Sequence, residues 1–172
     1  LRWRIEHVQC ITDKDIEKLG KHNIIPSVQP THATSDFSWA IQRLGIKRLE
    51  NCYRYDQLKN QNNLIALGTD FPVEKINPIH TFYAATFRKN YDDKPLGGFQ
   101  PDESLSRVDA LKGMTIWAAL ANFEENEKGS IEEGKAADLT ILNTDLITCQ
   151  ENEILNSKVL YTVVDGEIVY EN

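Results

Sequence analysis

Three polar residues follow apolar segments at widely separated points of the sequence. His7 lies near the end of the segment 3–9, His32 comes just after the segment 24–29, and Asp70 closes the apolar run that begins at Leu64. Imidazole is a common metal ligand, and a carboxylate at the tip of an apolar strand needs a metal, a cation or hydrogen-bond donors nearby. Each residue also has an ordinary structural interpretation: a satisfied histidine, a loop residue, or an aspartate that caps a turn.

Short apolar segments predict the strands that would position these residues. Segments 3–9, 24–29 and 64–68 have the length of strands, and 64–68 is apolar on both faces, as in a parallel strand covered by helices. Helical stretches separate the segments, and parallel strands need such long crossovers. Because parallel strands end at one rim, we expect His7, His32 and Asp70 to lie together there, where (β/α)8 barrels carry their active sites.

Local signals set the expected helix boundaries. Thr12 is placed to cap a first helix and Gly20 to end it, whereas Pro30 is expected to stop the second strand. Ser35-Asp36 is expected to cap the next helix. The remaining helical stretches are predicted to cover residues 39–44, 49–58, 79–88 and 107–121. The segment 90–103 between the last two is rich in Gly and Pro and long enough to cover a site.

The pattern changes near residue 123. Short β runs occupy 139–142, 159–164 and 167–170, and Asp165-Gly166 is a strong two-residue hairpin signal between the last two. We therefore predict an α/β portion up to about residue 122, followed by a small all-β portion.

Composition excludes several classes of partner. The chain has 172 residues, 41% of them hydrophobic, and a net charge of -7. This acidic balance argues against nucleic acid and anionic membranes as partners, and no apolar run approaches the ~20 residues that cross a bilayer. Neither a Gly-x-Ser-x-Gly nucleophile elbow nor a glycine-rich phosphate loop occurs.

The cysteines predict neither a zinc ribbon nor a disulfide framework. Cys10, Cys52 and Cys149 are odd in number and widely spaced, without any Cys-x-x-Cys pair. We expect free, partly buried thiols in a reducing, cytoplasmic compartment.

Several motifs together resemble the amidohydrolase superfamily, in the subgroup called amidohydrolase family 3. Arg-Ile-Glu-His, Ser-Val-Gln-Pro-Thr-His and Gly-Thr-Asp-Phe-Pro-Val resemble successive strand ends of that family, in that order; they occupy 4–7, 27–32 and 68–73. The glycine-containing turn 129–139 and the ending 162–170 resemble its return into a β-sandwich and its last hairpin. The resemblance covers essentially the whole chain.

The resemblance implies a fold class and residue roles. The fold would be α/β: the C-terminal part of a (β/α)8 TIM-like barrel, strands 6–8, over residues 1–122, then a β-sandwich portion over residues 123–172. His7 and Asp70 would bind a divalent metal, zinc being suited to such ligands, and Asp70 would shuttle the proton. His32 and Gln29 would contact a small-molecule substrate, in which a non-peptide C–N bond is hydrolysed.

The chain departs from the family pattern upstream. The family's His-x-His pair and its middle-strand ligands have no counterpart here, because the four histidines include no such pair. We expect a fragment of a hydrolase that is inactive alone and whose partner is the missing N-terminal barrel half. A homo-oligomer formed at the strand edge 3–10 and a non-catalytic binding or regulatory protein that keeps the fold are the alternatives.

Overall fold

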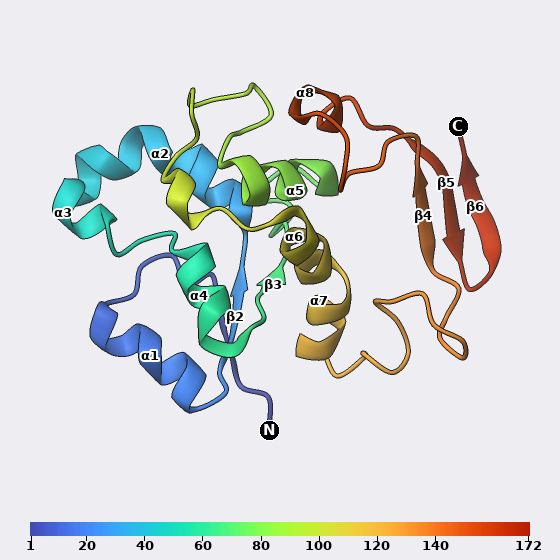
Figure 1. Ribbon diagram of the computed structural model, residues 1–172, viewed down its shortest axis with the longest axis horizontal. Helices are drawn as coiled ribbons and strands as arrows, with labels where there is room; N and C mark the ends of the chain where they lie inside the picture. The colour runs from blue at the N-terminus through green and yellow to red at the C-terminus, as the bar shows by residue number, and fades with distance from the viewer.

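A parallel sheet forms the centre of the molecule. The computed structural model describes all residues 1–172, and its first sheet has the order β1 (Arg4–Glu6), β2 (Ile25–Val28), β3 (Ala66–Leu67). Both strand pairs are parallel, with Glu6 opposite Ser27 and Val28 opposite Leu67. Figure 1 shows these strands in the middle of the molecule with helices around them. The alternation of strands and helices therefore predicted the sheet type correctly, although the strands are shorter than expected.

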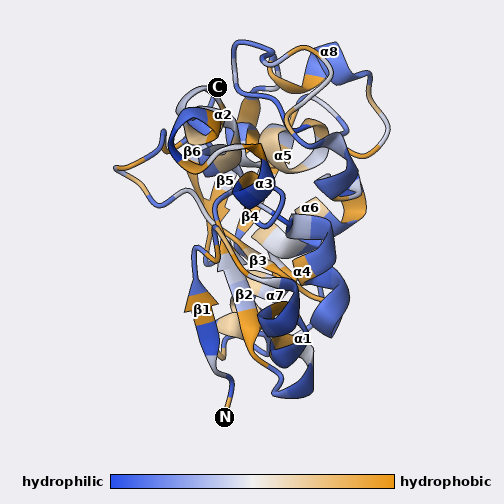
Figure 2. Cartoon of the chain, turned by 90° about the vertical axis from the view of Figure 1, so that its left-hand side faces the viewer, coloured by the Kyte–Doolittle hydropathy of each residue, from blue (hydrophilic) through white to orange (hydrophobic).

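The crossovers between the strands are helical. The chain forms α1 (Asp13–Lys21) between β1 and β2, then α2 (Pro30–Leu44), α3 (Ile46–Leu49) and α4 (Tyr55–Asn62) before β3. Helix α1 buries Ile16 and Leu19 on one face, as their spacing predicts. In Figure 2, hydrophilic residues dominate α1, whereas the interior strand β2 contains apolar residues.

Helix α2 begins at Pro30, before the cap that the sequence analysis expected at Ser35-Asp36. Pro30 stops the strand as predicted, but it also occupies the first turn of α2, where its missing N–H costs nothing. Ser35 and Asp36 consequently lie inside the helix and do not cap it. Asp36 instead accepts a hydrogen bond from the Tyr53 hydroxyl at 2.8 Å.

Four further helical segments complete the α/β portion. They are α5 (Pro78–Phe87), the short 3-10 helix η1 (Pro101–Glu103), α6 (Arg107–Met114) and α7 (Ile116–Ala121). The single helix predicted over 107–121 is divided at Thr115, whose φ of -125° and ψ of -99° are not helical. A side chain at Gly113 would meet Leu67 at 2.7 Å, so this glycine lets α6 approach β3 closely.

The long segment 90–103 packs against the core. Phe99 is buried, and its carbonyl accepts a hydrogen bond from the buried Arg88 guanidinium at 2.8 Å. At the other end of the segment, Tyr91 stacks on His80 with ring centroids 5.2 Å apart.

The chain's first residues are held by the end of α7. Arg2 donates to the Leu120 carbonyl at 2.8 Å and forms an ion pair with Glu125, and Arg4 donates to the Ala121 carbonyl at 3.0 Å. Cationic side chains thus satisfy carbonyls at the C-terminal end of a helix. The outer edge of β1 has no strand beside it.

The last fifty residues form a separate antiparallel sheet. Strands β4 (Leu139–Leu142), β5 (Val159–Val164) and β6 (Glu167–Glu171) pair in that order, and α8 (Glu151–Ile154) lies between the first two. The predicted Asp165-Gly166 hairpin is present, with φ of 51° and 81° at its two central residues. These strands lie together at the right-hand end of Figure 1.

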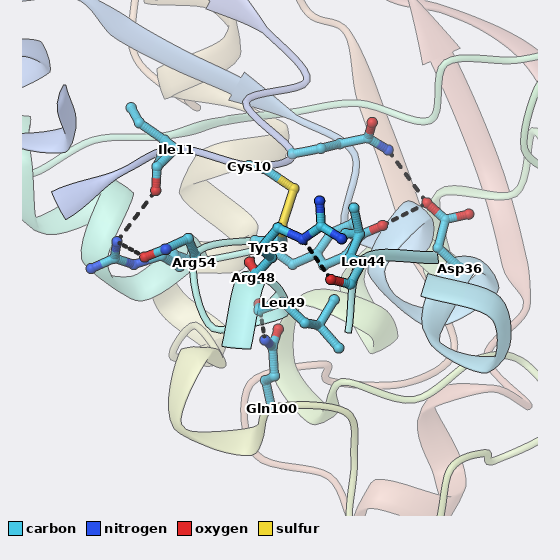
Figure 3. Close-up of a disulfide and its surroundings, with 12 residues drawn as sticks. Cys10, Ile11, Asp36, Leu44, Arg48, Leu49, Tyr53, Arg54 and Gln100 are labelled. Carbon is cyan, nitrogen blue, oxygen red and sulfur yellow. Dashed lines mark hydrogen bonds between the residues drawn. A yellow bond between two sulfur atoms is a disulfide. The ribbon is translucent and has the colours of Figure 1, made fainter. Parts of the chain in front are cut away.

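The expectation of three free cysteines is wrong. Cys10 and Cys52 form a disulfide, and only Cys149 is free. The two backbones lie side by side, because Ile11 N–H donates to the Asn51 carbonyl at 2.8 Å and Tyr53 N–H to the Gln9 carbonyl at 2.7 Å. Figure 3 shows the bridge between these segments. The fold, and not the spacing in the sequence, brings the two thiols together.

None of the helices combines the length and the apolar content that crossing a bilayer requires.

Candidate metal and substrate site at the ends of the parallel strands

The three predicted residues meet at one edge of the parallel sheet. His7 follows β1, His32 lies in the first turn of α2 after β2, and Asp70 follows β3. The His7 and His32 rings stack with centroids 5.7 Å apart. One oxygen of Asp70, Oδ2, lies 3.9 Å from His7 Nδ1 and 3.8 Å from His32 Nε2. The structure therefore brings together the residues that the sequence placed on one rim.

The backbone that presents two of these residues is unusual. His7 and Asp70 both adopt positive φ, 69° and 55° respectively. Non-glycine residues seldom occupy this region, and Asp and His are enriched among those that do. This conformation turns the chain sharply at the strand ends, where the sheet opens to solvent.

Gln29 holds the His7 ring. Its side-chain oxygen Oε1 lies 2.8 Å from His7 Nδ1, and Gln29 itself is buried. With the Gln29 amide in this orientation its oxygen accepts, so that His7 Nδ1 carries the proton and Nε2 presents its lone pair. A histidine that ligates a metal through one nitrogen usually donates from the other in this way. Gln29 was predicted as a substrate contact; the structure places it against His7.

His32 is almost fully enclosed. It is 7% exposed, and its Nε2 is buried without a hydrogen-bond partner. The other ring nitrogen, Nδ1, lies 3.5 Å from the side-chain nitrogen of Gln9. An unpartnered buried nitrogen costs free energy unless a ligand or a bound group satisfies it. The Nε2 atom is therefore available to whatever binds beside Asp70.

The carboxylate of Asp70 is aimed at the same space. The distances of 3.8 and 3.9 Å to the two histidines exceed a hydrogen bond, and the side chain is 37% exposed. The turn that follows is closed by the backbone, because Val73 N–H donates to the Asp70 carbonyl at 2.8 Å. The Asp70 carboxylate therefore does not cap the turn that follows it.

These groups suit a divalent metal as part of a larger ligand set. His7 Nε2 and the Asp70 carboxylate are the donor types that zinc and related metals bind. The structure contains no cluster of three His, Cys, Asp or Glu side chains that could hold a metal ion. Two donors are fewer than the three protein ligands that catalytic zinc sites have.

The sequence analysis missed a second group of polar residues behind His32. Asp36 Oδ2 accepts from the Tyr53 hydroxyl at 2.8 Å and lies 3.4 Å from Gln9 Nε2. Figure 3 shows the bond from Tyr53 to Asp36 close to the disulfide. Burial, and then the bond to Asp36, raise the pKa of the Tyr53 hydroxyl, so it is a donor at neutral pH. Gln9 follows His7 by two residues, and this was the available signal.

The two remaining histidines differ from each other. His22 is exposed at the end of α1. His80 is partly buried in the wall of a cavity of about 500 Å³ that Thr31, Glu74 and Tyr91 also line. Burial, and then the nearby Lys75 ammonium, lower the pKa of His80.

Comparison with known proteins identifies the class to which this fold and site belong. A family model described as amidohydrolase family matches residues 1–170. The chain therefore belongs to the amidohydrolase family, which confirms the resemblance seen in its motifs.

Its relatives are longer proteins. The chain is 36% identical to Protein LONG AFTER FAR-RED 3 of Arabidopsis thaliana over 98% of its own length and 29% of that protein. It is 30% identical to putative amidohydrolase YtcJ of Bacillus subtilis over 98% of itself and 32% of that protein. It is 36% identical over 107 residues to an N-substituted formamide deformylase of Arthrobacter pascens, covering 62% of this chain and 19% of that enzyme. The chain thus spans less than a third of the length of these relatives.

A solved structure has the same arrangement of elements. An uncharacterized metal-dependent hydrolase from Pyrococcus horikoshii superposes with a TM-score of 0.76 at 30% identity, over 87% of this chain and 30% of that one.

Proposed function

We propose that this chain is the C-terminal part of a metal-dependent amidohydrolase, which hydrolyses a non-peptide carbon–nitrogen bond of a small molecule. One observation carries the proposal: two histidine rings converge on a single oxygen of Asp70, at 3.9 and 3.8 Å. The similarity to a formamide deformylase and to a metal-dependent hydrolase supports the reaction class. Zinc is the metal that we propose, since imidazole and carboxylate suit it.

In this proposal the parallel sheet is one arc of a barrel. Strands β1, β2 and β3 would be the sixth to eighth strands of a (β/α)8 barrel over residues 1–122, and β4 to β6 would belong to a β-sandwich portion over residues 123–172. Helical crossovers between parallel strands, and residues gathered at the strand ends, are what that barrel requires.

Each site residue then has a defined task. A bound divalent metal supplies Lewis acidity, which lowers the pKa of water towards ~7 and polarises a carbonyl. His7 would hold the metal through Nε2, with Gln29 fixing the ring. Asp70 would bind beside it, take a proton from the attacking water and pass it to the leaving nitrogen. His32 would contact the substrate through Nε2.

The unpaired edge of β1 is where we propose that the remainder of the barrel adds. Trp3 and Ile5 are 66% and 44% exposed there, and an open strand edge invites another strand. The occupant would be the N-terminal part of the same protein. If this chain forms a defined homodimer by sedimentation and the full-length protein does not, a second copy is the occupant instead.

Metal content tests the proposed function. The full-length protein that contains this chain should hold about one or two metal equivalents by mass spectrometry, and the 172-residue chain nearly none. His7→Ala in the full-length protein should lose metal, whereas His22→Ala, at an exposed position, should keep it. A full-length protein that binds no metal would overturn the proposal and return His7 and Asp70 to structural roles.

A further inference from the structure

We propose that Gln9 is a positioning residue that places the proton of His32 on Nε2, so that His32 presents a hydrogen-bond donor to the substrate. The assignment deepens the proposed function and rests on it for the identity of the ligand. It follows from a chain of acceptors and donors that begins at Asp36, behind the site.

The first step fixes the orientation of the Gln9 amide. A glutamine side chain can present either its oxygen or its nitrogen, and the two look alike in shape. Asp36 resolves the choice, because an ionised carboxylate only accepts. The Gln9 nitrogen lies 3.4 Å from Asp36 Oδ2, and the Tyr53 hydroxyl donates to that same oxygen at 2.8 Å. The reversed amide would place two acceptor oxygens against each other.

The second step carries this orientation to His32. The same Gln9 nitrogen lies 3.5 Å from His32 Nδ1 and has a second N–H to donate. Nδ1 must then offer its lone pair, and a neutral imidazole with an unprotonated Nδ1 carries its proton on Nε2. Asp36 thus sets the tautomer of His32 through the amide of Gln9, without a hydrogen bond of its own to the ring.

The third step gives the ligand chemistry. Nε2 of His32 is buried without a partner and lies 3.8 Å from Asp70 Oδ2. A donor held in this position recognises an acceptor, and in an amide-like substrate that acceptor is the carbonyl oxygen, on which negative charge develops during attack. The opposite tautomer would present a lone pair to that oxygen and repel it.

The neighbouring ring shows the complementary arrangement. Gln29 accepts from His7 at 2.8 Å and leaves the Nε2 lone pair of His7 free. Two glutamines therefore give two stacked histidines opposite tautomers, one suited to hold a metal and the other to donate a proton. The geometry assigns substrate contact, and not metal ligation, to His32.

The tautomer can be measured directly, without metal or substrate. The chain has four histidines, so 15N-histidine labelling and long-range 1H–15N NMR give a small set of signals, which His32→Asn assigns. The spectra are recorded at about pH 8.5, two units above the ordinary imidazole pKa. Wild-type His32 should show a protonated Nε2 and an unprotonated Nδ1.

Two variants test the role of Gln9. Gln9→Met keeps the length of the side chain but cannot donate, and it should lower the ratio of Nε2–H to Nδ1–H about fivefold, the effect of one hydrogen bond. Asp36→Asn can donate to Gln9, which lets the amide reverse and should shift His32 towards Nδ1–H. Gln42→Met is the matched control, because the Gln42 amide only bonds the Ser38 carbonyl of its own helix.

The outcomes separate this inference from the proposed function. An Nδ1–H tautomer in the wild type, or a ratio that changes no more in Gln9→Met than in Gln42→Met, would overturn the role of Gln9 even if the full-length protein binds metal. If Gln9→Met does not fold, the wild-type spectrum and Asp36→Asn still decide. In an active full-length enzyme, Gln9→Met should lower kcat about tenfold while metal content stays unchanged.

Discussion

Nε2 of His32 and Oδ2 of Asp70 face each other across 3.8 Å, with no hydrogen bond between them. His32 is buried and Asp70 is partly exposed, so the space between them opens towards solvent from the Asp70 side. A buried nitrogen and a carboxylate that face each other without a hydrogen bond can both contact a group bound beside them.

We predict that Asp70 carries the proton transfer in the full-length enzyme. Asp70→Asn keeps the size of the side chain but removes its basicity, so kcat should fall by about 10²–10⁴-fold. His22→Ala, an exposed position at the end of α1, should leave kcat within about twofold. Steady-state kinetics on a C–N hydrolase substrate measure both. Equal losses in the two variants would refute the role of Asp70.

Gln29 should control metal affinity through His7. Gln29→Met removes the acceptor 2.8 Å from His7 Nδ1 and should weaken metal binding about 10–100-fold. Gln29→Glu keeps an acceptor there and should restore most of the affinity. Competition with a chelator measures the dissociation constants. A higher KM without any loss of metal affinity would instead favour the substrate contact predicted from the sequence.

The Cys10–Cys52 bridge should stabilise the chain. It spans 42 residues, and closing a loop of this length contributes about 2–4 kcal/mol to the free energy of unfolding. The double variant with Cys10→Ser and Cys52→Ser should lose this amount in urea titrations followed by circular dichroism. Cys149→Ser, at the free cysteine, is the control and should cost less than about 1 kcal/mol. Alkylation of all three cysteines in the folded protein would contradict the bridge.

The Arg2–Glu125 ion pair predicts a pH dependence. The hydrogen bond from Arg2 lowers the pKa of Glu125 from 4.5 to about 2. A carboxyl group with a lowered pKa in the folded state stabilises the protein above pH 4.5, and this contribution is lost as the pH falls from 4.5 to about 2. Glu125→Gln should therefore lower Tm above this range and match the wild type below it.

Thermal unfolding followed across this pH range measures the effect. Glu127→Gln is the matched control, since Glu127 is exposed and forms no ion pair. A difference in Tm between Glu125→Gln and the wild type that does not change with pH would show that the ion pair is not its source.

The sequence predicted which residues meet at one edge of the parallel sheet, because order along the chain determines position in such a sheet. His7, His32 and Asp70 each follow one of the three parallel strands, and parallel strands end on one side. The hairpin at Asp165-Gly166 could also be predicted, because its sequence signal lies within the turn itself. These features needed no knowledge of the packing.

The features that escaped prediction depend on contacts between distant segments. Gln9 meets Asp36 across 27 residues, and Cys10 meets Cys52 across 42. No short sequence motif predicts such contacts, because they depend on how the intervening helices pack. The start of α2 was missed for another reason: Pro30 signals both the end of a strand and the first turn of a helix.

The contacts of Arg2 with Leu120 and Glu125 can form only late in the synthesis of the chain. These two partners lie 118 and 123 residues downstream of Arg2. While the ribosome is still adding α1 to α6, these contacts cannot form, because their partners on the C-terminal side have not been made. Pausing of translation before residue 125 would lengthen the time without them, whereas pausing after it would not.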